Sequence, residues 1–92
     1  MYISEWEWTD EVVDHLARHG VRAADVLAVW RHEPKYRRNR KRRSATHQMI
    51  GPDASGVFLA IFIRDDAVYQ GRWRVVTGRL ATAQERDWWR RS

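Results

Sequence analysis

Cysteine is absent from this chain of 92 residues, so neither a disulfide nor a thiolate site can form. Apolar runs are also short, and none approaches the roughly 20 residues that a membrane-spanning helix needs. The first residues, Met1-Tyr2-Ile3-Ser4-Glu5, have neither the basic start nor the apolar stretch of a secretory signal peptide. We therefore expect a cytoplasmic protein without membrane contact. Its length predicts one domain, 1–92, with a single modest core.

Negative charge is missing from residues 35–43, which carry seven of the 17 lysines and arginines. This basic run accounts for the whole net charge of +5, because the rest of the chain has ten basic and 12 acidic residues. Lys and Arg side chains that neutralise phosphates release counterions, which drives salt-sensitive binding to nucleic acid. A tyrosine in the run fits RNA, where planar side chains stack on unpaired bases. The candidate RNA-binding residues are Lys35, Tyr36, Arg37, Arg38, Arg40, Lys41, Arg42 and Arg43. The alternative is a solvated loop that only aids solubility.

The order of hydrophobic and turn residues predicts an α+β fold. Thr9 and Thr82 stand at N-cap positions of helical patterns, and Gly20 suits the end of the first helix. We expect the two N-terminal helices to lie across one face of a mainly antiparallel sheet. The basic run is then a loop between the second helix and that sheet. The predicted elements in chain order are a strand over 2–8, helices after Thr9 and over 23–30, strands over 46–50, 57–63 and 72–77, and a short helix after Thr82.

Side-chain directions can be predicted for two of these elements. In the strand over 72–77, strict alternation places Trp73, Val75 and Thr77 on the face opposite to Arg74. In the C-terminal helix, Trp88 and Trp89 are adjacent, so we expect only one of them to face inward. The other is a candidate anchor for a partner protein, because tryptophan is enriched at interface hot spots.

Four segments, in order along almost the whole chain, carry a family resemblance. They are Trp8 before an acidic helix start, Arg18-His19-Gly20-Val21 before the second helix, Ile50-Gly51 at a strand end and, as the most specific part, the tail from Arg74 to Arg86. Together they resemble the BrnT toxins, which have a RelE-like fold. His15 stands where that family carries an asparagine, which indicates a divergent member.

The resemblance implies the toxin component of a type II toxin–antitoxin pair, a metal-independent endoribonuclease that cleaves mRNA and inhibits translation. It implies no cofactor. The implied partners are RNA and a cognate antitoxin, which we expect to be acidic, with operator DNA bound only through the antitoxin complex.

RNA cleavage without a metal needs a base for the 2′-hydroxyl, an acid for the leaving 5′-oxygen, and cations for the charge of the transition state. Histidine exchanges protons near neutral pH, which makes His19 the first acid–base candidate. His47 is a second catalytic candidate on a strand, where it either binds the phosphate or only packs. A histidine in the last turn of a helix can instead serve only to stabilise its dipole. His15 and His32 are expected to be exposed helix residues, and we predict no metal site.

Arginine binds phosphate oxygens with two parallel hydrogen bonds, so Arg64, Arg74 and Arg79 are candidates to contact the scissile phosphate. Glu85 is a further catalytic candidate because it lies in the family-like tail, although it also completes a capping box with Thr82. Two other functions stay open. One is a non-catalytic nucleic-acid-binding module of the same fold, and the other is a protein-interaction domain whose basic run docks an acidic partner.

Overall fold

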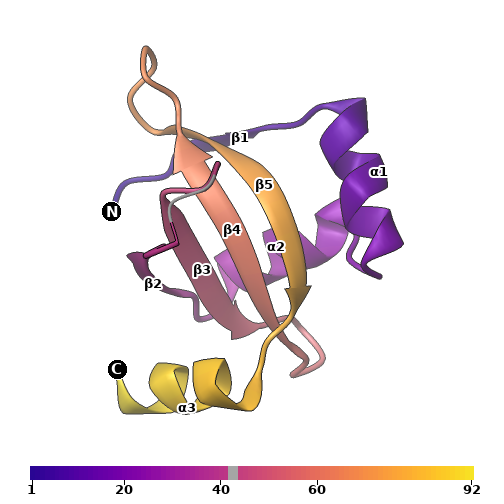
Figure 1. Ribbon diagram of the computed structural model, residues 1–92, viewed down its shortest axis with the longest axis vertical. Coiled ribbons are helices and arrows are strands. Elements are labelled where there is room, and N and C mark those ends of the chain that lie inside the picture. Colours follow the sequence, from indigo (N-terminus) through magenta and orange to yellow (C-terminus); the bar gives the residue numbers. More distant parts are fainter. Residues whose placement is uncertain (42–43) are drawn as a thin grey trace.

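The described residues, 1–41 and 44–92 of a computed structural model, form a five-stranded mixed sheet and three helices (Figure 1). The strand order is β1-β5-β4-β3-β2, with β1 parallel to β5 and the other neighbours antiparallel. This confirms the predicted α+β class. The elements in chain order are β1 (Glu5–Glu7), α1 (Asp10–Arg18), α2 (Ala23–Arg31), β2 (Lys35–Arg38), β3 (His47–Pro52), β4 (Phe58–Asp65), β5 (Arg72–Leu80) and α3 (Ala83–Arg91).

The N-terminal helices bury the main core against one face of the sheet. Thr9 caps α1, since its Oγ1 accepts a hydrogen bond of 3.2 Å from the backbone N–H of Val12. Gly20 follows the end of α1 with φ +74°, a left-handed conformation that glycine adopts without steric cost. Leu16 of α1 and Val26 of α2 are fully buried against strand residues of the main core, such as Met49. Both helix predictions are confirmed, and none of the helices in the described part of the chain is long and apolar enough to cross a membrane.

Helix α3 covers one end of the opposite face. The predicted capping box is present, because Thr82 Oγ1 accepts from the Glu85 N–H and the Glu85 carboxylate accepts from the Thr82 N–H. Both Trp88 and Trp89 pack against this face, contrary to the expectation that only one would. The Trp89 ring packs against Phe58, with centroids 5.0 Å apart, while the Trp88 ring stacks with Arg37 of β2.

The basic run is not entirely a loop, because residues 35–38 form the edge strand β2. Alternation explains why this charged sequence can pair. Tyr36 packs against the main core, whereas Lys35 and Arg37 are directed to the other face. Charged side chains are well tolerated on an edge strand, since its outer side meets water. Arg42 and Arg43, two of the candidate RNA-binding residues, lie outside the described residues.

An irregularity in β5 changes which side chains share a face. Val75 pairs with Ile63, but Thr77 pairs with Phe62, so Val76 is an extra residue on the β5 side. Such a bulge reverses the alternation beyond it. Trp73 and Val75 are buried in the main core as predicted, whereas the prediction that Thr77 shares their face is wrong. Thr77 instead joins the face that carries Arg74.

Candidate nucleic-acid interface

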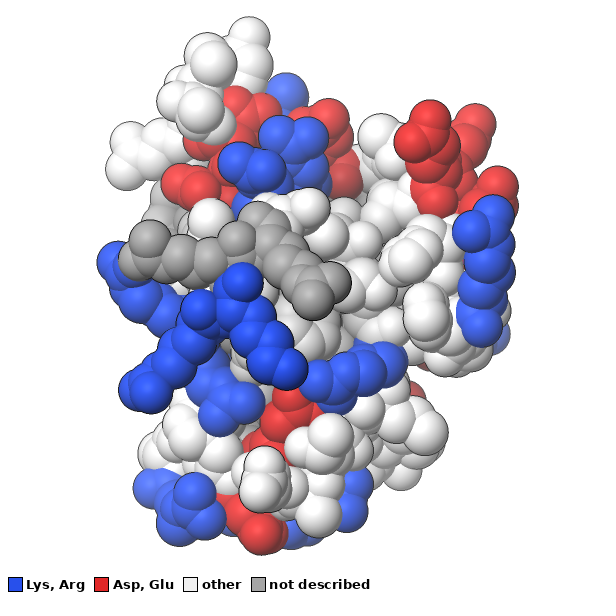
Figure 2. Space-filling view, viewed as in Figure 1, with Lys and Arg blue, Asp and Glu red and all other residues white. Residues whose placement is uncertain are grey.

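The part of the sheet that α3 leaves uncovered is the open face. Its polar and aromatic residues come from four strands, and Figure 2 shows lysines and arginines gathered over the middle of this side of the molecule. The strand register places them together because β3, β4 and β5 are neighbours and the bulge turns Thr77 outward. The open face comprises Arg37, Gln48, Phe62, Arg64, Arg74, Thr77 and Arg79.

Two predicted phosphate-binding residues, Arg64 and Arg74, face each other across β4 and β5. Both side chains are exposed. Within residues 1–41 and 44–92, neither guanidinium makes an ion pair or a side-chain hydrogen bond, although Glu7 is the register neighbour of Arg74 on β1. Like charges directly opposite each other destabilise a sheet. Their arrangement provides two donors for one anionic group.

A groove of about 670 Å³ lies between α1 and β5, and both Arg64 of β4 and Arg74 of β5 line it. Its apolar lining comes from Val12 of α1 and from Val75 and Val76 of β5. Charged and titratable groups surround the opening, and both signs are represented. These groups are Glu11, Asp14, His15 and Arg18 of α1 with Arg64 and Arg74 of the sheet. The groove therefore brings an imidazole and two strand arginines to one place.

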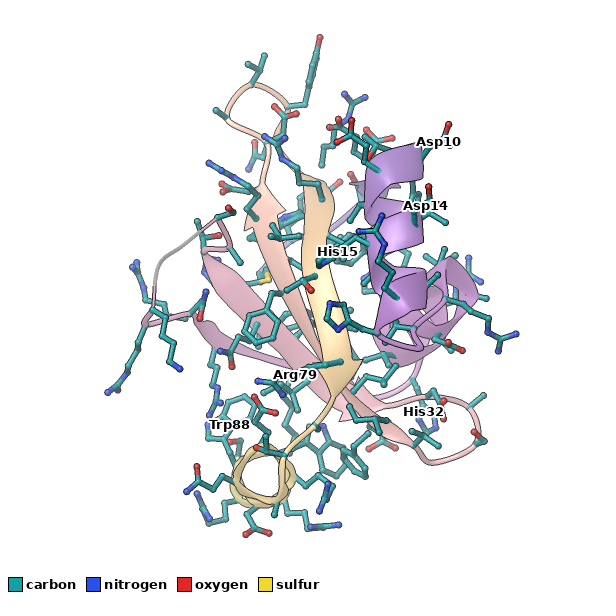
Figure 3. All side chains as sticks on the ribbon, turned by 45° about the vertical axis from the view of Figure 1, so that its right-hand side comes forward. Asp10, Asp14, His15, His32, Arg79 and Trp88 are labelled. Carbon is teal, nitrogen blue, oxygen red and sulfur yellow. The ribbon has the colours of Figure 1, made fainter. Side chains whose placement is uncertain are left out.

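His15 is the member of this group that sequence reasoning missed. Figure 3 shows it projecting from α1 across β5. Its Nε2 lies 2.9 Å from Thr77 Oγ1, and its ring stands edge-on to that of His19 with centroids 4.9 Å apart. His19, the first acid–base candidate, is exposed and serves as the C-cap residue of α1. The sequence feature that could have revealed this pair is the spacing of four residues between His15 and His19, because it puts both rings on one side of a helix.

Arg79 and Glu85 form the most strongly paired contact on the open face. The Arg79 guanidinium donates to both carboxylate oxygens, at 2.7 and 3.0 Å, and lies 5.2 Å from the centroid of the Phe62 ring. The Glu85 side chain is only 7% exposed. Burial alone would raise the pKa of Glu85, but hydrogen bonds from Arg79 and Thr82 outweigh it and hold that pKa below its ordinary value. The structure thus ties both predicted catalytic residues to the junction of β5 and α3, where Figure 3 shows Arg79.

His47, the second histidine candidate, is not part of the open face. It pairs with Ile63, and its ring packs edge-on against Trp73 with centroids 5.3 Å apart. Partial burial and the positive charge of Arg38 lower the pKa of His47. The structure therefore separates His47 from Arg64, Arg74 and Arg79 by the thickness of the sheet.

The basic run divides into residues that hold α3 and residues that face solvent. Lys35 Nζ donates to the carbonyl oxygens of Trp89 and Ser92, each at 2.6 Å. Arg37 Nε donates to Gln48 at 2.7 Å, and its guanidinium lies 4.7 Å from the centroid of the Trp88 ring.

Tyr36 is half-buried, and this burial raises its pKa. The remaining described cations, Arg38, Arg40 and Lys41, are exposed. They are therefore the part of the run that is accessible to a polyanion.

Comparison with known proteins leaves the site to be interpreted from its own residues. No protein-family model matches the chain, and a search of curated proteins finds no significant match. Among the residues that the structure describes, no cluster of three or more His, Cys, Asp or Glu side chains is arranged to hold a metal ion. The main features are a cationic sheet face, a groove beside it and a histidine pair of which His15 lines the groove.

Proposed function

We propose that the protein is an endoribonuclease toxin of the BrnT-like class, with a RelE-like fold, which binds mRNA across the open face and cleaves it without a metal ion. The observation that carries the proposal is the opposed pair Arg64 and Arg74 at the groove beside α1. RNA cleavage builds negative charge on a phosphoryl group, and fixed guanidinium groups stabilise such charge without reorganisation. Strand pairing fixes the backbone positions of Arg64 and Arg74, so a bound phosphate would have to order only their side chains.

The architecture supports the same reading. The resemblance implies an N-terminal strand, two helices on one face of a mainly antiparallel sheet, and a short helix at the end of the chain. The structure has these parts in that order, and α3 leaves most of the opposite face uncovered. A catalytic face that carries an arginine pair would then lie opposite the main core, where its side chains do not compete with packing.

RNA contact would extend beyond the arginine pair. Phe62 offers a half-buried aromatic surface on the open face, and a base can stack on such a ring whatever its identity. Arg40 and Lys41 lie exposed beyond the edge strand and can neutralise neighbouring phosphates. Phosphate binding by these side chains would give affinity without sequence preference, and the groove would position one phosphodiester for cleavage.

A toxin of this kind would act in the cytoplasm and would be held inactive by a cognate antitoxin. The exposed positive charge of the open face and of Arg38, Arg40 and Lys41 fits an acidic antitoxin that occupies the same surface as RNA. Operator DNA would be contacted through the antitoxin, as the resemblance implies. This account makes RNA and antitoxin mutually exclusive partners.

One observation favours a second candidate, a non-catalytic RNA-binding module. Arg79 was a leading candidate for the scissile phosphate, yet its guanidinium is neutralised by the buried Glu85. A chain that had lost catalysis would keep the cationic face and this structural pair. The two candidates differ in whether bound RNA is cut.

Induced expression in bacterial cells tests the proposal directly. We expect growth arrest together with new 5′ ends in cellular mRNA, and we expect both to disappear in the double variant Arg64→Ala/Arg74→Ala. Arg31→Ala is the matched control, because Arg31 is an exposed arginine on α2. Growth without new 5′ ends in cells that accumulate folded wild-type protein would contradict the proposal. RNA binding by that same protein would then favour the module.

A further inference from the structure

We infer that His15 and His19 are the acid–base pair of the proposed ribonuclease and that Thr77 positions His15. This inference rests on the proposed function and assigns its chemistry to the groove. His15 lines the groove together with Arg64 and Arg74. The reacting groups would therefore come from a helix, and the groups that bind phosphate would come from strands.

The histidine pair is held in place by contacts on two sides. His15 Nε2 lies within hydrogen-bond distance of Thr77 Oγ1, at 2.9 Å, and the β5 bulge is what turns Thr77 toward it. On the other side the His15 ring meets His19, with centroids 4.9 Å apart and planes at 66°. Two imidazoles at this spacing can reach the two oxygens that are bonded to the same phosphorus atom. A phosphate held by Arg64 and Arg74 would supply that phosphorus.

The reaction balances without any further reactant. The His15 imidazole accepts the proton of the 2′-hydroxyl while that oxygen forms a bond to phosphorus. The bond from phosphorus to the 5′-oxygen breaks, and the His19 imidazolium donates a proton to this leaving oxygen. The products are a 2′,3′-cyclic phosphate and a 5′-hydroxyl.

The positions of the two histidines indicate which is the base and which is the acid. His15 is half-buried in the groove and held by Thr77, which suits the base. His19 is exposed at the C-terminal end of α1, where the helix dipole attracts a cation, which suits the protonated acid.

Charged groups from three elements line the groove together with His15. The groups that line the groove are Glu11, Asp14 and Arg18 on α1, Arg64 on β4 and Arg74 on β5. The arginines would bind the phosphate, and the carboxylates lie on the helix that carries both rings.

The test compares four purified proteins on one RNA transcript in excess EDTA: the wild type, His15→Ala, His19→Ala and the control His32→Ala. His32 is an exposed histidine at the end of α2 (Figure 3). We expect kcat to fall by about 10²–10⁴-fold in His15→Ala and in His19→Ala, with the Kd for RNA unchanged within about twofold. His32→Ala should retain wild-type values. The cut ends should be a cyclic phosphate and a 5′-hydroxyl, and a 2′-deoxy substitution at the cleaved position should prevent cutting.

Thr77 is tested as a positioning residue. Thr77→Val should lower kcat without changing the Kd for RNA, and Thr77→Ser, which restores the hydroxyl, should recover most of the rate. His15→Gln is the control for loss of folding. Its side chain keeps a polar partner for Thr77 but cannot exchange a proton, so the variant should remain folded and inactive.

Two results would overturn the inference while leaving the ribonuclease itself in place. One is a wild-type rate in both histidine variants. The other is loss of wild-type cleavage in EDTA with recovery on adding zinc, which would mean that the histidines bind metal instead. Absence of cleavage by the wild type under every condition would overturn the inference and the proposed function together.

Discussion

Arg64 and Arg74 stand directly opposite each other on β4 and β5, so two guanidinium groups of the same charge share one place on the open face. Neither is paired with a carboxylate in the part of the chain that the structure describes. Opposed like charges lower the stability of a sheet. The arrangement is understandable if an anion normally lies between the two side chains.

Neutralising one arginine should therefore stabilise the protein and weaken RNA binding. Arg64 is the better position, because Arg74 also has Glu7 as a neighbour on β1. We expect Arg64→Gln to raise the free energy of unfolding by about 0.2–1 kcal/mol in denaturant titrations. The slope of log K for RNA against log salt should become shallower by about one. Arg31→Gln should change neither quantity, and a destabilised Arg64→Gln that binds RNA normally would contradict this account.

Glu85 should matter for stability through its ion pair with Arg79. Glu85→Gln keeps the side chain length and a capping group for α3 but removes the charge that binds the guanidinium. We expect a loss of about 1–2 kcal/mol in the free energy of unfolding, reduced because the Arg79 side chain is 42% exposed and can turn to water. Asp87→Asn, which removes an exposed carboxylate from the same helix, serves as the control. An equal effect of both substitutions would contradict the assignment.

The same carboxylate predicts a pH dependence. Because the pKa of Glu85 is lower in the folded protein than in the unfolded chain, its ion pair contributes fully above the ordinary glutamate value of about 4.3. That contribution is lost as the pH falls below this value toward the folded pKa. The difference in unfolding free energy between wild type and Glu85→Gln should thus hold its value down to about pH 4.3 and shrink as the pH falls below it. A constant difference over that range would show that Glu85 acts only as a cap.

Substitutions should distinguish the residues of the basic run that stabilise the fold from those that bind RNA. Lys35→Met removes a cation from the C-terminal end of α3 and from the face of Trp89, and should cost about 1–2 kcal/mol of unfolding free energy. Arg40→Gln/Lys41→Gln lies on an exposed turn and should leave stability within about 0.5 kcal/mol. That double variant should instead reduce the salt slope of RNA binding by about two. Unchanged RNA affinity would mean that this part of the run is only a solvated turn.

Helix ends and buried strands could be predicted because their signals are local. Thr9, Gly20 and Thr82 each act within one helical turn, and all three stand where the sequence placed them. The apolar strand over 57–63 likewise became β4 because it carries its own burial signal.

The missed features depend on contacts between distant segments. Strand β2 is charged, and only its pairing with β3 makes it a strand. The direction of Thr77 depends on a bulge that arises from the register with β4. His15 looked like an exposed helix residue because its partner Thr77 lies 62 residues further along the chain. For the arginine candidates the sequence was a better guide, since Arg64 and Arg74 lie together on the open face, whereas His47 lies on the opposite face.

The central claim is that the protein cleaves RNA and needs the arginine pair beside the groove to do so, and one assay with purified protein tests it most directly. Labelled mRNA is incubated in excess EDTA with the wild type, with Arg64→Ala/Arg74→Ala and with the control Arg31→Ala. We predict cleavage by the wild type and the control, with a loss of at least about 10²-fold in kcat for the double variant. Intact RNA with the wild type, or cutting by the double variant at the wild-type rate, would contradict the claim.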